Sequence, residues 1–152
     1  MHEIKNILER IQRYCAYRER CLKEVRLKLN EWSVSPKMSE EIFSRLISSG
    51  YLNEERFAQF YVSGKFRHNS WGRMRIVREL EFREISPRVI KKALEHIDEK
   101  EYVNELQRLI FGKVKGFDVR NDIEKKNRVA QYCIRKGYEA TLVWEILNKK
   151  CL

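Results

Sequence analysis

Carboxylates, thiols and imidazoles are the side chains of this sequence that could perform catalysis or bind a metal. Two adjacent pairs, Glu40-Glu41 and Glu54-Glu55, have the composition of a general acid–base pair. Neighbouring residues on a helix point about 100° apart, however, and carboxylates in a first turn favour the helix dipole. We therefore interpret both pairs as features of helix starts.

The sequence offers no convincing set of metal ligands or catalytic motif. Its cysteines, at 15, 21, 133 and 151, form no Cys-x-x-Cys and no paired spacing with a histidine, so we expect reduced thiols, with Cys15 and Cys133 facing the core. Asp118 and Asp122 are interpreted as capping or solvated residues, and His68, in an expected basic loop, as a contact for solvent or an anion. Phosphate-loop, nucleophile-elbow and His-Glu-x-x-His motifs are missing. We expect no catalytic residue, cofactor or metal, and no enzyme.

The chemistry that remains is binding through positive charge. The chain of 152 residues has 32 Lys+Arg against 22 Asp+Glu, net +10, which favours a polyanionic or acidic partner. The charge is concentrated: segments 10–28, 63–92 and 113–136 carry net +5, +6 and +5, and the stretches 39–56 and 93–111 are negative.

A helical wheel over residues 73–82 separates an apolar face from a basic one. Ile76 and Leu80 fall on one side, with Arg75, Arg78 and Phe82 opposite. Arginines beside an exposed aromatic suit phosphate contact with base stacking, or a protein interface; equally, the arginines could be solvated and Phe82 could pack on an adjacent repeat. Our candidate binding residues are Lys65, Arg67, Arg73, Arg75, Arg78, Phe82, Arg83, Lys125, Lys126 and Arg128.

The elements that must position these residues are all helices. Apolar residues recur at helical spacing, no segment alternates with period two, and the six glycines and two prolines leave few breakers. The first two expected helices cover about 3–16 and 20–32, and the third starts at the N-cap Ser39 and stops at Gly50. The next four helices begin after Asn53, Gly72, Ser86 and Asp98, and the helix that follows Asn53 ends before residue 68. The last two helices end near Gly137 and near residue 149.

The helices repeat in triplets. The apolar frame Ile76, Leu80, Ile85, Val89, Ile90, Leu94 recurs, shifted by 53, as Val129, Cys133, Tyr138, Leu142, Val143, Leu147. A first copy, Val25, Leu29, Val34, Ile42, Phe43, Ile47, fits once four residues are inserted in its loop. We expect an all-α protein of three tandem three-helix repeats, 1–50, 51–97 and 98–152, in an elongated, curved arrangement with an extended binding surface.

Several short motifs resemble the RecX family of bacterial regulatory proteins. They are the run from Gly50 through Asn53-Glu54-Glu55-Arg56-Phe57 to Ala58, then Gly72-x-x-Arg75-Ile76-x-x-Glu79-Leu80, Ile85-Ser86 and, more weakly, Lys136-Gly137-Tyr138. The chain departs from the family at Glu84, where a glycine is usual, at Cys21, where a serine is common, and in the loop 33–36. We therefore expect the helix before Ile85 to end without a left-handed glycine cap.

The resemblance implies a regulator that binds the RecA filament on DNA, lies along its groove, and inhibits ATP hydrolysis, strand exchange and coprotease activity. We expect a monomer whose partners are the RecA filament and DNA, single- or double-stranded, bound with weak sequence selectivity. No apolar run approaches a transmembrane span and the start does not resemble a signal peptide, so a cytoplasmic location is expected. Two alternatives stay open: a general DNA-binding protein acting without RecA, and a helical adaptor for an acidic protein.

Overall fold

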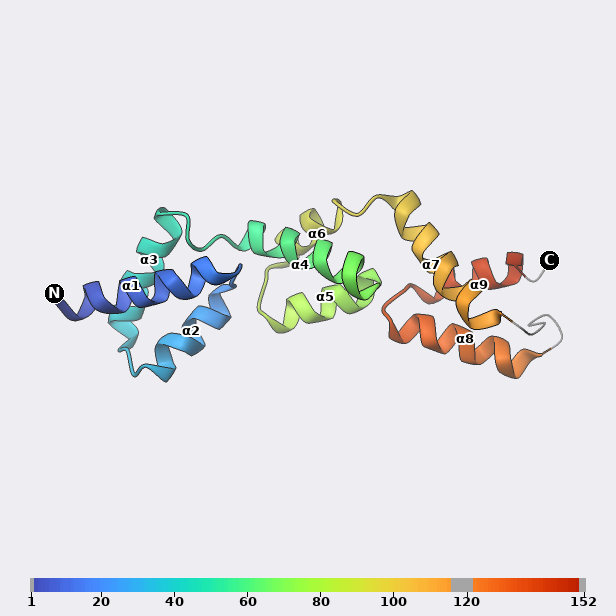
Figure 1. Ribbon diagram of the computed structural model, residues 1–152, viewed down its shortest axis with the longest axis horizontal. Coiled ribbons are helices and arrows are strands. Elements are labelled where there is room, and N and C mark those ends of the chain that lie inside the picture. The colour runs from blue at the N-terminus through green and yellow to red at the C-terminus, as the bar shows by residue number, and fades with distance from the viewer. Residues whose placement is uncertain (1, 116–121, 151–152) are drawn as a thin grey trace.

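The computed structural model describes residues 2–115 and 122–150, which form an elongated row of helices (Figure 1). Within these ranges there are helices and no strand: α1 (His2–Tyr17), α2 (Leu22–Glu31), α3 (Pro36–Ser48), α4 (Glu54–Asn69), α5 (Arg73–Phe82), α6 (Pro87–Leu94), α7 (Glu99–Val114), α8 (Ile123–Arg135) and α9 (Ala140–Lys150). They follow one another as three triplets along the long axis, with the two termini at opposite ends of the row. The expected all-α repeat architecture is confirmed.

Side-chain caps begin α4, α6, α7 and α8 where the sequence predicts them. Asn53 accepts a hydrogen bond from the N–H of Arg56 at 3.0 Å, and Ser86, Asp98 and Asp122 cap α6, α7 and α8 in the same way. The capping role expected for Asp122 is thus confirmed, whereas Asp118 lies outside the described residues. His68 was expected in a loop, but α4 continues to Asn69 and includes it in its last turn.

The predicted start of α3 is wrong. The helix begins at Pro36, and the N-cap is Ser35, whose hydroxyl accepts from the N–H of Met38 at 3.2 Å. Ser39, the predicted cap, lies one turn inside the helix and is 6% exposed. Because Ser35-Pro36 and Ser86-Pro87 both open helices and are 51 residues apart, the first repeat needs no insertion in this loop; its extra residues lengthen α3 at its C-terminal end.

One backbone position is left-handed in every repeat. Ser33, Glu84 and Gly137 each follow the middle helix of their triplet and have φ of +58°, +61° and +110°. The helix before Ile85 thus ends without a left-handed glycine, as expected, but Glu84 adopts the left-handed conformation in its place. A side chain bearing a Cβ is strained in this region, so Ser33 and Glu84 store energy that Gly137 does not.

The buried side chains form two separate cores. One lies within the first triplet and contains Ile7, Ile11, Cys15, Val25, Leu29, Val34, Ile42, Phe43, Leu46 and Leu52. The other runs continuously through the second and third triplets, and Cys21 of the first triplet is buried in it. The predicted burial of Cys15 and Cys133 is confirmed.

The second and third triplets meet at two glycines. A Cβ added to Gly72 would lie 2.3 Å from the carbonyl carbon of Gly137, and one added to Gly137 would lie 2.5 Å from Cβ of Arg75. The N–H of Gly72 donates to Lys136 O and that of Met74 to Gly137 O, both at 2.8 Å. This close approach of two backbones explains why glycine stands at both positions.

The first and second triplets meet through fewer, more polar contacts. Arg56 Nε lies 2.7 Å from Glu19 Oε2, and an exposed guanidinium of Arg26 lies 3.7 Å from Glu84. Lys23 Nζ donates to the carbonyl of Phe82 at 2.7 Å. Such exposed pairs contribute about 0–1 kcal/mol each, so this junction is less firmly held than the glycine junction.

Candidate nucleic-acid interface

The middle helices of the three triplets share one edge of the molecule. In Figure 1, α2, α5 and α8 lie along the lower edge of the row. The basic segments 63–92 and 113–136 contain α5 and α8, and the segment 10–28 covers the first seven residues of α2. Part of each positive stretch therefore lies on this edge, although the stretches also include residues of α1, α4 and α6.

In the second triplet, three of the candidate basic side chains lie against two aromatic rings. Lys65 Nζ lies 4.8 Å from the Trp71 ring centroid and 5.4 Å from that of Tyr61. The guanidinium of Arg75 lies 4.1 Å from Trp71, and that of Arg83 lies 4.8 Å from Tyr61. Each such contact is worth about 0.5–2 kcal/mol and fixes a long side chain before a ligand arrives, which lowers the entropic cost of binding.

The rings themselves are held by packing between α4 and α5. Tyr61 stacks on buried Phe57 with ring centroids 5.7 Å apart, and meets Trp71 edge-on at 6.4 Å. Burial raises the pKa of Tyr61, so its phenol stays neutral near pH 7. We name the set Tyr61, Lys65, Trp71, Arg75 and Arg83 the cation–aromatic cluster.

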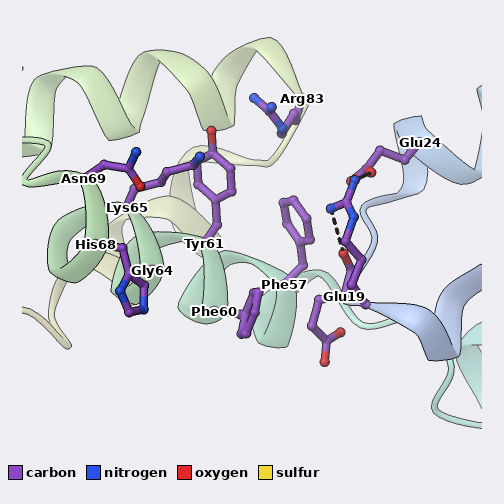
Figure 2. A pocket seen from close by; sticks show the side chains of 11 residues that line it. Glu19, Glu24, Phe57, Phe60, Tyr61, Gly64, Lys65, His68, Asn69 and Arg83 are labelled. Atoms are coloured by element: carbon purple, nitrogen blue, oxygen red, sulfur yellow. Dashed lines mark hydrogen bonds and ion pairs between the residues drawn. The ribbon is translucent and has the colours of Figure 1, made fainter.

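A pocket of about 480 Å³ opens beside this cluster, at the junction with the first triplet. Figure 2 shows Phe57 and Tyr61 rising from α4 on the side of Arg83, with Glu24 facing them from the first triplet. The pocket's acidic groups are neutralised within the protein: Glu24 pairs with Arg18 at 3.0 Å, and Glu19 pairs with Arg56. Lys65 makes no ion pair with any described residue, so its charge is available to a ligand.

Arg73 has a different environment from its neighbours on α5. Its guanidinium lies 2.9 Å from Glu99 and 2.8 Å from Glu139, and 3.9 Å over the ring of Tyr102. Burial raises the pKa of Tyr102, whose hydroxyl donates to Glu139 at 2.5 Å. Two carboxylates of the third triplet thus account for the charge of Arg73 without a ligand.

The remaining candidates on the second triplet are solvent-facing. Arg67 and Arg78 are exposed, and Phe82 is 68% exposed. The ring of Phe82 does not pack on an adjacent repeat's core; it lies 4.0 Å from Lys23 Nζ of the first triplet. Phe82 therefore offers an exposed aromatic surface beside the first junction.

The three candidates on α8 are not brought together with the cluster. Lys125 Nζ lies 3.8 Å from Asp122, Arg128 lies 2.9 Å from Glu124, and Lys126 is half-buried. Sequence reasoning missed the rings that organise the basic residues, namely Tyr61, Trp71 and, on α8, Tyr132. The i, i+4 spacing of Tyr61 and Lys65 could have predicted that these two side chains meet on one helix face. Trp71 lies in the turn between α4 and α5, where helical spacing does not predict contacts.

The structure gives little support for redox or metal chemistry in the part of the chain it describes. Burial raises the pKa of Cys15, Cys21 and Cys133 to about 11 each, so these thiols remain protonated and unreactive near pH 7. Residues 2–115 and 122–150 contain no group of three or more His, Cys, Asp or Glu side chains able to hold a metal ion. None of their helices is long and apolar enough to cross a membrane.

Comparison with known proteins confirms the resemblance to the RecX family. The family model described as the second three-helix domain of RecX matches residues 53–94. The regulatory protein RecX of Bacillus subtilis is 29% identical over 141 residues, which are 93% of this chain and 53% of that protein. The regulatory protein RecX of Trichlorobacter lovleyi is 27% identical over 127 residues, 82% of each chain. The chain thus spans about half the length of its Bacillus subtilis relative.

Solved structures share the fold. The crystal structure of RecX from Lactobacillus salivarius superposes with a TM-score of 0.87 at 22% identity, over 97% of this chain and 96% of that one. A second crystal structure of a regulatory protein RecX gives a TM-score of 0.85 at 18% identity, over 95% and 73%. The chain therefore shares its fold, the row of helical triplets, with these solved structures.

Proposed function

We propose that this chain is a non-enzymatic regulatory protein that binds the RecA filament on DNA. In this proposal the protein inhibits the filament's ATPase, recombinase and coprotease activities. It acts in the cytoplasm, in recombination, DNA repair and the SOS response. The similarity to regulatory proteins named RecX supports the class of function. The observation that carries the proposal furthest is the row of three triplets with its basic middle helices along one edge.

The shape suggests how such inhibition would work. An elongated monomer that contacts neighbouring subunits and the DNA backbone at several weak points gains avidity, because each contact raises the local concentration for the next. Lys65, Arg75 and Arg83, already ordered by Tyr61 and Trp71, would supply phosphate contacts at little further entropic cost. No deep catalytic cleft is required.

A DNA-dependent ATPase assay of RecA, titrated with this protein, tests the proposal. We expect inhibition at or below an equimolar ratio to RecA, because one elongated molecule would block more than one subunit. An unrelated DNA-dependent ATPase on the same single strand is the control and should be unaffected at that ratio. Unchanged RecA turnover at excess protein would overturn the proposal.

The second candidate is a general DNA-binding protein that needs no RecA, and the cation–aromatic cluster favours it. Stacked arginines and lysines suit a phosphate backbone, and no helix shows the Asn, Gln and Arg set that reads base edges. The same assay separates the two: equal inhibition of both ATPases, by coating the DNA, would favour the second candidate.

A further inference from the structure

The third triplet contains a basic pocket that lies apart from the cation–aromatic cluster. It has a volume of about 310 Å³, at the lower end of the range typical of ligand pockets. Its lining is Lys113 from the last turn of α7, and Lys125, Arg128, Val129, Tyr132 and Arg135 from α8.

The lining residues of α8 form one continuous face. Their positions, 125, 128, 129, 132 and 135, follow the three- and four-residue steps that place side chains on the same side of a helix. Val129 is buried and Tyr132 half-buried, so they form an apolar base. The other lining residues are all basic, and Lys113 Nζ lies 4.1 Å from the Tyr132 ring centroid.

Four positive charges around one small concavity repel one another, and the protein only partly offsets this. Among the described residues that line the pocket there is no carboxylate. Glu124 pairs with Arg128 at 2.9 Å and Asp122 with Lys125 at 3.8 Å, but all four side chains are more than one-third exposed, so solvent screens both pairs. Lys113 and Arg135, both exposed, make no ion pair with any residue in 2–115 or 122–150. An anion in the pocket would relieve this repulsion.

We infer that this pocket binds phosphate groups of a single-stranded nucleic acid. Guanidinium groups match the geometry of phosphate oxygens with paired hydrogen bonds, and ammonium groups add point charges at the sides. The inference deepens the proposed function, on which it rests for the identity of the strand. It assigns contact residues, Lys113, Tyr132 and Arg135, that the wheel of α5 does not reveal.

Repetition within the chain favours a strand over a free phosphate. The 53-residue shift that relates the second and third repeats places Arg128 where Arg75 stands, so both repeats carry an arginine at the same position of their middle helix. The first repeat has Glu24 at this position, and its Arg20 is buried and pairs with Glu24, so the repetition covers the second and third triplets only. A backbone with regularly spaced charges can contact both triplets in succession, whereas a single anion contacts only one.

Fluorescence anisotropy with a short labelled oligothymidylate, in the absence of RecA, tests the inference. The variant Lys113→Gln/Arg135→Gln removes two charges from the pocket. Lys91→Gln/Lys100→Gln removes the same charge from two exposed residues of α6 and α7 outside it and is the matched control. We expect the pocket variant to weaken binding about tenfold and to lower the slope of log K against log salt by about 1.4, which corresponds to two single-strand phosphate contacts. The control should leave the slope unchanged.

Competition and nuclear magnetic resonance identify the ligand. Adding the oligonucleotide should shift the methyl resonances of Val129 in the parent protein, and the pocket variant should lose that shift while its melting temperature stays that of the parent. Equal slopes for the two variants would overturn the inference. So would full competition by pyrophosphate, which would indicate a free phosphate, or by polyglutamate, which would indicate an acidic peptide. Because RecA is absent from these assays, their failure is distinct from failure of the ATPase prediction.

Discussion

Among single residues, Glu84 has the clearest conflict between its chemistry and its backbone. It holds φ at +61°, where a Cβ is costly, and its side chain makes only an exposed 3.7 Å pair with Arg26. We predict that Glu84→Gly raises the free energy of unfolding by about 1 kcal/mol, because relief of strain exceeds the loss of a screened pair. Urea denaturation measures this.

The control for that substitution is Glu84→Ala, which removes the carboxylate and keeps the strained Cβ. It should leave stability unchanged or slightly lower. If alanine and glycine stabilise equally, then removal of the carboxylate, and not the backbone, explains the gain.

Arg75 and Arg78 test the basic edge at the level of side chains. Arg78 is exposed, whereas Arg75 stacks on Trp71, so we predict that Arg75→Ala/Arg78→Ala costs about 1 kcal/mol of stability, mostly through the lost stacking. Binding to single-stranded DNA should weaken by an amount that shrinks as salt rises, since exposed charges are screened. Anisotropy titrations over a range of salt concentrations measure this effect. Parent-like affinity and RecA inhibition would place the binding face elsewhere.

The sequence predicted single residues well only where one helix decides their environment. The wheel places Arg78 and Phe82 outward, and both are exposed. It could not predict that Arg73 pairs with Glu99 and Glu139, because those carboxylates come from another triplet and are brought to it by the glycine junction. Nor could it show that Arg75 rests on Trp71.

At the scale of elements, the start of α3 shows what the repeat itself could have revealed. Two serines, Ser35 and Ser39, precede apolar residues at helical spacing, and the presence of glutamates after Ser39 made it the apparent cap. Comparison with Ser86-Pro87 at a constant offset of 51 identifies Ser35 instead. The insertion of four residues obscured this correspondence, because it aligned the apolar residues of the two repeats but moved Ser35-Pro36 out of alignment with Ser86-Pro87.

The corrected register leaves a hydroxyl in the first core. Ser39 is 6% exposed, its Oγ has no hydrogen-bond partner among the described residues, and the residue at its place in the second repeat is Ile90. We predict that Ser39→Ala raises the free energy of unfolding by about 1 kcal/mol or more, because a buried unsatisfied hydroxyl is removed. Thermal and urea melts measure the change.

Ser44 on the same helix provides the matched control. It is exposed, so Ser44→Ala gains only the higher helix propensity of alanine, about 0.5 kcal/mol. A gain for Ser39→Ala no larger than this would show that the hydroxyl of Ser39 finds a partner, such as a buried water.

For the whole molecule, the contrast between the two junctions matters most. The second and third triplets share one core and touch at Gly72 and Gly137, whereas the first has its own core. We predict that Gly72→Ala destabilises the second and third triplets by about 3 kcal/mol, since its Cβ would overlap backbone atoms at 2.3–2.5 Å. Circular dichroism melts should then show an early transition that leaves the first triplet folded.

Gly64 gives the opposite result and serves as the control. A Cβ there meets nothing within 4 Å, and the residue lies inside α4, so Gly64→Ala should stabilise by about 1 kcal/mol. A single cooperative transition in Gly72→Ala at the parent's midpoint would contradict the importance assigned to the glycine contact.

The glycine junction also has a consequence for how the chain is made. The N–H groups at the start of α5 donate to acceptors on the third triplet: the N-cap Gly72 to Lys136 O, Arg73 to the hydroxyl of Tyr102, and Met74 to Gly137 O. The first core, by contrast, contains no residue after Leu52 among those described. During synthesis from the N-terminus, the first triplet can fold as soon as it leaves the ribosome. The N–H groups at the start of α5 in the second triplet lack their full set of acceptors until residues 136–138 have emerged. Nascent chains stalled before that point should therefore present a folded leading triplet followed by a segment that chaperones and proteases recognise.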